Sequence, residues 1–193
     1  TNTQFKKFKN FFKNKIKVID CTFDINSSLK DRIEKIRDEA ETAVREGCNN
    51  LILSDKKINT YSASIPSVLA AGAIHSHLVK LGLRGYCSLN VESSDALDTH
   101  SFAVLIGVGA TTINPYLAID SIYQRFEKKL FGKLEFESCV KKFKKSIDAG
   151  LLKIMSKMGI SVISSYRGGC NFEAVGLSRA IVSDYFSGMT SRI

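Results

Sequence analysis

Short apolar segments typical of buried β-strands alternate with amphipathic helical segments along the chain, and this alternation restricts the fold more than any other feature. The strand-like segments cover residues 16–23, 50–54, 86–91, 112–116 and 160–164. Strands joined through helices run parallel, because the chain must cross back before each new strand begins. We therefore predict one α/β domain with a parallel sheet of about five strands and helical crossovers, either Rossmann-like or a partial (βα) barrel.

Capping and stop residues mark the ends of the predicted helices. Ser28 is expected to cap the first helix of the domain, and Gly47 follows its end. A break near Gly132 divides the longest helical stretch into a pair. The helices are expected at residues 28–45, at 66–81, up to 106, over most of 117–158 and from about 171.

The 193-residue chain carries 28 Lys and Arg against 19 Asp and Glu, a net charge of +9, and much of this excess lies in the first 17 residues. There, lysines interleave with Phe5, Phe8, Phe11 and Phe12, which predicts a basic amphipathic helix over residues 1–17, followed by the α/β domain over residues 18–193. Such a helix could bind nucleic acid or an anionic membrane. We favour a Phe face packed on the domain and solvated lysines, because Arg, the residue suited to specific phosphate contacts, is scarce. We therefore expect neither a nucleic acid nor a membrane as partner.

Composition excludes several other classes. An apolar share of 44% is that of a globular chain, and no uninterrupted apolar run approaches the roughly 18 residues of a membrane span. The cysteines at positions 21, 48, 87, 139 and 170 show no pair spaced for zinc or an iron–sulfur cluster. We read them as reduced thiols of an intracellular protein, and the absence of an initiator Met suggests a piece of a longer chain.

Polar residues follow the predicted strands, where parallel α/β domains usually bind ligands. Arg167-Gly168-Gly169 lies between the last predicted strand and a helix, so its backbone N–H groups could hold an anion; the alternative is a tight turn with a surface Arg. The candidates for an anion site or a contact with another domain are Ser165, Tyr166, Arg167, Gly168, Glu92 and Asn114.

Two other motifs in the sequence do not indicate a metal site or a dinucleotide-binding site. His75 and His77 are two residues apart on a predicted helix, so they face different directions and do not form a metal pair. Gly107 and Gly109 follow a helix and precede a strand, the reverse of the order in a dinucleotide-binding loop. We therefore predict no catalytic, cofactor-binding or metal-binding residue in this chain.

Several stretches, in order along the chain, resemble the central domain of the glutamate synthase large subunit. They include Leu51-Ile-Leu-Ser-Asp55, Ile65-Pro-Ser-Val-Leu-Ala-Ala-Gly-Ala-Ile-His75, Ile113-Asn-Pro-Tyr-Leu-Ala118, Gly150-Leu-Leu-Lys-Ile-Met-Ser-Lys-Met-Gly-Ile-Ser161 and Phe172-Glu-Ala-Val-Gly-Leu177.

This resemblance implies an enzyme that makes L-glutamate from glutamine and 2-oxoglutarate, of which this chain alone would be inactive. In that family a glutaminase domain releases ammonia, which travels inside the protein to an FMN domain, and a [3Fe-4S] cluster relays electrons. The central domain links the two catalytic domains, which are the expected partners, together with a small NAD(P)H-oxidising subunit or ferredoxin. The resemblance also implies a cytoplasmic or plastid location, and the excised chain is expected to self-associate.

Overall fold

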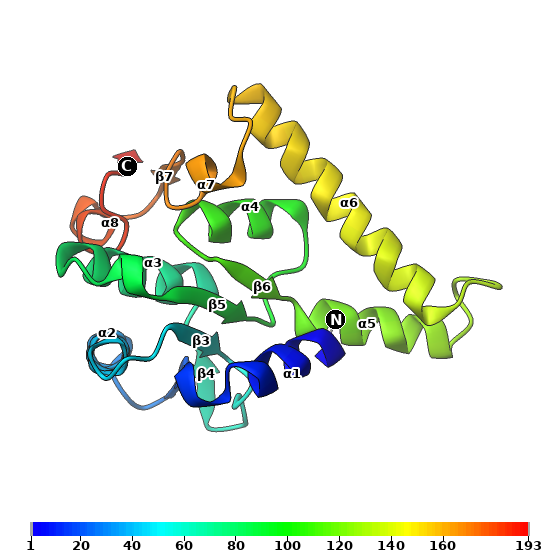
Figure 1. The fold of residues 1–193 in the computed structure, drawn as a ribbon, viewed down its shortest axis with the longest axis horizontal. Helices are drawn as coiled ribbons and strands as arrows, with labels where there is room; N and C mark the ends of the chain where they lie inside the picture. Colours follow the sequence, from blue (N-terminus) through cyan, green and yellow to red (C-terminus); the bar gives the residue numbers. More distant parts are fainter. Residues whose placement is uncertain (1, 193) are drawn as a thin grey trace.

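A computed structural model describes residues 2–192 and shows a four-stranded parallel sheet surrounded by helices (Figure 1). The strands follow one another across the sheet in chain order: β1 (Ile16–Asp20), β3 (Asn50–Ser54), β5 (Ser88–Glu92) and β6 (Thr112–Asn114). The predicted α/β class with a parallel sheet is confirmed, with four strands in place of about five. In a Rossmann fold the strand order reverses at one point in the sheet, whereas here it does not. The sheet therefore has the strand order of part of a (βα) barrel, but the described strands do not close into one.

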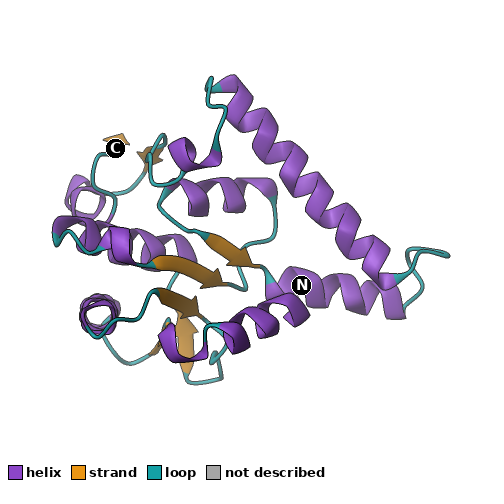
Figure 2. Ribbon diagram, in the orientation of Figure 1, coloured by secondary structure: helices purple, strands orange, loops and turns teal. Residues whose placement is uncertain are grey.

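The crossover helices are α2 (Leu29–Arg45), α3 (Ser67–Lys80) and α4 (Thr99–Gly107), and α3 packs against both of the others (Figure 2). As predicted, Ser28 caps α2, and its Oγ accepts from the Asp31 N–H over 3.3 Å. Asp98 caps α4 in the same way, accepting from the Ser101 N–H over 2.8 Å. These local hydrogen bonds satisfy N–H groups that the first turn of a helix leaves free.

The two faces of the sheet differ in chemistry. Residues such as Leu51, Leu89 and Val91 are buried with the inner faces of the crossover helices in the main hydrophobic core. Side chains alternate along a strand, so the residues between them point to the opposite face. That face is polar at Asn90 and Glu92, and α1 (Asn2–Phe11) contributes Lys9 to it. The predicted N-terminal helix is therefore present but ends at Phe11, while Lys17 belongs to β1.

A helical pair extends from the end of β6, as predicted (Figure 1). It consists of α5 (Tyr116–Glu127) and α6 (Phe136–Lys157), and Gly132, with a φ of +62°, lies in the connection between them. No helix within residues 2–192 is both long and apolar enough to cross a membrane.

The C-terminal part differs from the prediction. Residues 160–164 do not form a strand, and no helix begins at Asn171. The chain instead forms α7 (Ile163–Tyr166), β7 (Glu173–Val175), α8 (Arg179–Tyr185) and β8 (Thr190–Arg192), with β7 and β8 paired in parallel. A short apolar run does not distinguish a strand from a helical turn, and a strand also needs a neighbour for its backbone groups. Here Val162 and Ile163 stay about half exposed, while Tyr166 takes the buried position.

Further short elements complete the structure. The strands β2 (Thr22–Asp24) and β4 (Ser62–Ser64) form an antiparallel pair that the strand pattern did not predict. The 3₁₀ helices η1 (Lys13–Lys15) and η2 (Arg84–Tyr86) precede β1 and β5.

Candidate functional site

The carboxyl ends of the four parallel strands place a row of polar residues across the sheet. In the strand register, Asp20 lies beside Ser54, Ser54 beside Glu92, and Glu92 beside Asn114. The four residues share one face because they occupy equivalent positions in the pleat. The structure thus brings together Glu92 and Asn114, two of the predicted site residues.

Glu92 is the centre of this row and is only 3% exposed. Its carboxylate accepts from Ser54 Oγ at 3.0 Å and from Asn114 Nδ2 at 3.3 Å. Lys9 Nζ from α1 lies at 3.0 Å and Lys56 Nζ at 2.9 Å. Burial by itself would raise the pKa of Glu92, but the hydrogen bonds from Lys56 and Lys9 outweigh it and hold that pKa below its usual value. Glu92 is therefore ionised, and its carboxylate holds together the four residues that contact it.

The neighbouring carboxylates of Asp55 and Asp95 also accept hydrogen bonds. Asp55 Oδ2 accepts from the Ser94 N–H at 2.8 Å and from Ser94 Oγ at 2.6 Å. Asp95 accepts from the Ser67 N–H at 3.0 Å, at the start of α3. These bonds connect the loops after β3 and β5 to each other and to a helix, so their first role is to fix the edge of the sheet.

The Cys21 thiol and the Tyr116 hydroxyl at this edge are poorly suited to act as nucleophiles. Cys21 is 3% exposed, and burial raises the pKa of its thiol to about 12, so it stays protonated at neutral pH. Burial, with the nearby Asp55, also raises the pKa of Tyr116 to about 12.

Among the residues from 2 to 192, no group of three His, Cys, Asp or Glu side chains is placed to hold a metal ion.

The other predicted site residues lie elsewhere. Gly168 lies next to Gly109, and Gly109 belongs to the loop that precedes β6. Residues 165–168 therefore lie near the amino end of β6 and not at the carboxyl edge of the sheet. Tyr166 is buried, and its hydroxyl donates to the Ala103 carbonyl over 3.1 Å. Residues 165–168 therefore do not share the carboxyl edge with Glu92 and Asn114, because the strand predicted at 160–164, which would have placed them there, does not form.

The backbone of the Arg167 loop is not arranged as an anion cradle. The N–H groups of residues 167–170 donate to the carbonyls of Ile163, Ile106, Tyr166 and Gly107, over 2.9 to 3.1 Å. Because these donors are used within the protein, they do not converge on an external anion. The remaining candidate role of this loop, a contact with another domain, stays a prediction.

A second polar cluster, which sequence reasoning missed, lies beside this loop. Arg84 donates from Nε to His75 Nδ1 at 3.0 Å, and from its two Nη atoms to the carbonyls of Cys87 and Gly109 at 2.5 and 2.7 Å. Burial, and then the Arg84 charge, lowers the pKa of His75 to about 4. His75 is thus a neutral acceptor that orients Arg84, while His77 contacts Glu41 on α2 at 3.0 Å. The two histidines have separate partners, as their spacing predicted.

Comparison with known proteins gives a consistent family. A family model described as the glutamate synthase central domain matches residues 1–178. The chain is 50% identical to the glutamate synthase [NADPH] large chain of Azospirillum brasilense, over 100% of this chain and 13% of that protein. It is 46% identical to the corresponding large chain of Bacillus subtilis (strain 168), over 91% of this chain and 11% of the relative. The chloroplastic ferredoxin-dependent glutamate synthase of Spinacia oleracea is 39% identical, over 93% of this chain and 12% of its own length. The chain thus spans only about an eighth of each of these relatives.

Proposed function

Because this chain belongs to the family of glutamate synthase central domains, we propose that it acts as the non-catalytic central part of a glutamate synthase large chain. In this role it links the glutaminase domain to the FMN domain and helps to enclose the path of ammonia between them. The parent enzyme makes L-glutamate from glutamine and 2-oxoglutarate. FMN and a [3Fe-4S] cluster would be held by other parts of that polypeptide, in the cytoplasm or in a plastid.

The observation that carries this proposal is that polar side chains at the carboxyl edge of the sheet are bonded to other residues of the domain. This is where a parallel α/β enzyme usually places its reactive groups. Here Glu92 has four partners, and the Cys21 thiol is buried and protonated. Side chains bound in this way keep a framework rigid and are poorly suited to accept a proton from a substrate.

The experiment measures the coupling between the two reactions in the full-length large chain. Arg167 is exposed beside the buried Tyr166, and we propose that it contacts a neighbouring domain. Arg167→Ala should raise the ammonia released per glutamate formed severalfold, while glutamine hydrolysis continues. Arg125→Ala, at an exposed position on α5, is the matched control and should leave this ratio unchanged.

The 193-residue chain provides a second test. We expect it neither to hydrolyse glutamine nor to bind FMN, and measurable glutaminase activity of the pure chain would contradict the proposal. We also expect it to self-associate, because surfaces that other domains would cover are exposed. A monomer at high concentration in light scattering would argue against that expectation. The electron donor, either NAD(P)H through a further subunit or ferredoxin, is a property of the parent enzyme.

A further inference from the structure

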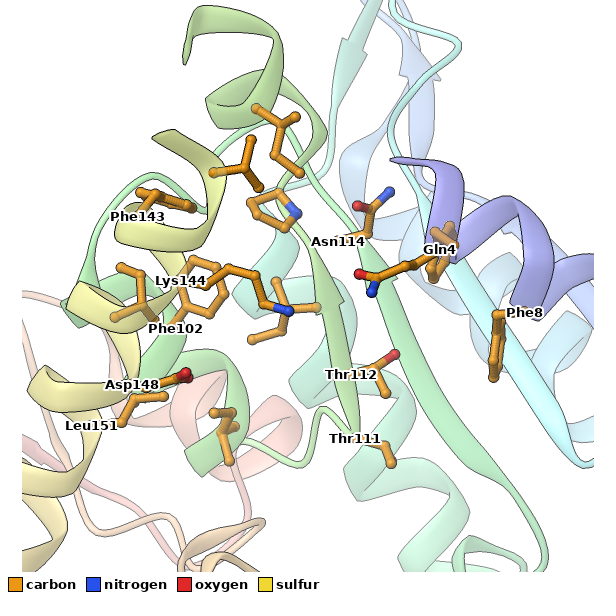
Figure 3. A pocket seen from close by; sticks show the side chains of 17 residues that line it. Gln4, Phe8, Phe102, Thr111, Thr112, Asn114, Phe143, Lys144, Asp148 and Leu151 are labelled. Carbon is orange, nitrogen blue, oxygen red and sulfur yellow. The ribbon is translucent and has the colours of Figure 1, made fainter. Parts of the chain in front are cut away.

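Strand β6 forms one edge of the central sheet, and its outer side borders an apolar cavity of about 480 Å³ (Figure 3). We call this cavity the β6 slot. It follows β6 from Thr111 to Pro115 and is bounded by α1, α4, α5 and α6. Among the described strands, β6 pairs only with β5. An edge strand presents backbone N–H and C=O groups that suit pairing with another extended segment.

The slot has apolar walls on both sides of the plane of the sheet. On the polar face of the sheet, α1 contributes Phe5 and Phe8. On the opposite side, α4 contributes Phe102, and α6 contributes Phe143 and Leu151. Figure 3 shows Phe8 on one side of β6 and Phe102, Phe143 and Leu151 on the other. The space therefore has the position of a fifth strand, whose alternate side chains would reach the two walls.

We propose that the β6 slot receives an extended, predominantly apolar segment of the same parent polypeptide, from outside residues 1–193, which pairs with β6 as an additional strand. This inference rests on the proposed function, since it requires the chain to be one domain of a longer protein. The relatives support that source, because the chain spans only 13% of the Azospirillum brasilense protein. A strand covered on both faces is expected to be an apolar run and not an alternating one.

The chemistry of the slot favours a strand over other occupants. No strand among residues 2–192 lies on the side of β6 away from β5, and an added strand can extend the sheet there, whereas a helix cannot. A small polar ligand would face mostly aromatic and aliphatic side chains, since Lys144 and Asp148 are the charged residues that line the cavity. Lys144 can instead lie along an inserted segment with its charged end toward solvent.

The test is photocrosslinking in the full-length large chain, with benzoylphenylalanine placed at Thr112. Thr112 is exposed and lines the slot, but its Oγ1 donates to Oδ1 of the buried Asn90 at 2.7 Å, so circular dichroism first checks that the variant is folded. The matched control places the same group at Lys35, an exposed position on α2. We expect the Thr112 adduct to join β6, within one polypeptide, to an apolar segment outside residues 1–193, and the Lys35 adduct not to reach that segment.

Other outcomes overturn the proposal. A crosslinked species of twice the mass would assign the slot to a second copy of the chain. Adducts confined to residues 1–193, or no adduct with the variant folded and active, would show that no such segment is present. Amide hydrogen exchange over residues 112–114 gives an independent readout, which should be slower in the full-length protein than in the 193-residue chain. None of these results depends on ammonia coupling, so failure of the slot proposal and failure of the proposed function are distinguishable.

Discussion

Lys9 and Glu92 lie 83 positions apart in the sequence, yet the Lys9 ammonium donates to the Glu92 carboxylate over 3.0 Å. This contact joins the N-terminal helix to the carboxyl edge of the central strand β5. It also explains how α1 is held over the polar face of the sheet, where Phe5 and Phe8 form one wall of the β6 slot. A single buried carboxylate therefore connects the framework to the surface that we propose as a docking site.

Replacing Glu92 by Gln should destabilise the domain by about 1–3 kcal/mol, because the variant leaves two lysines without their buried partner and weakens bonds to Ser54 and Asn114. Urea unfolding followed by circular dichroism measures the change. Glu46→Gln, at an exposed position, is the control and should change the free energy of unfolding by no more than about 0.5 kcal/mol. Equal stability of the two variants would contradict the role of Glu92 as an anchor.

The stability of the chain should fall as the pH is lowered from about 6.5 toward 4. The pKa of His75 is about 4 in the folded protein against 6.5 for the free side chain. In this range the unfolded chain binds a proton at His75 and the folded chain does not, so acid favours unfolding. Unfolding curves at several pH values should show a shallower dependence for His75→Gln than for the unchanged chain.

The control for the pH experiment is His100→Gln, because His100 is exposed. This variant should keep the dependence of the unchanged chain. If His75→Gln retained the full dependence as well, other groups would be responsible for it.

Gly109→Ala should cost considerably more stability than Gly132→Ala. Both residues have a positive φ, +112° and +62°, so each substitution carries a backbone cost of about 1–2 kcal/mol. A Cβ at Gly109 would also overlap the His75 ring, whereas a Cβ at Gly132 meets no atom within 4 Å. Thermal unfolding of both variants separates the two effects, and equal shifts would show that the close approach to His75 is unimportant.

Arg37→Lys should loosen the C-terminal segment from the body of the domain. Arg37 contacts the Asp184 carboxylate at 3.2 Å and its carbonyl at 3.1 Å, and it lies over the Tyr185 ring. Lysine cannot reproduce this planar, multidentate contact, and we expect a loss of about 1–3 kcal/mol. Limited proteolysis should cut near α8 several times faster in this variant. Arg45→Lys, which changes an exposed pair with Glu41, should not alter the rate.

Much of the framework could be predicted from the sequence. The alternation of apolar strands and helices predicted the parallel sheet, and Ser28, Gly47 and Gly132 marked helix boundaries that the structure confirms. The polar residues at the strand ends also indicated that Glu92 and Asn114 would meet. These features are local or follow from strand direction, so the order of residues is enough to reveal them.

Only the tertiary structure decided which side chains become partners. Lys9 is one of several similar lysines in its segment, and its selection by Glu92 depends on where α1 crosses the sheet. The residues at 160–164 have a strand-like pattern, but they form part of a loop and a short helix because no strand lies beside them. The β6 slot likewise exists only because α1 and α6, far apart in the sequence, flank the same strand. Periodicity and capping are set by neighbours along the chain, whereas partners and cavities depend on how distant segments pack.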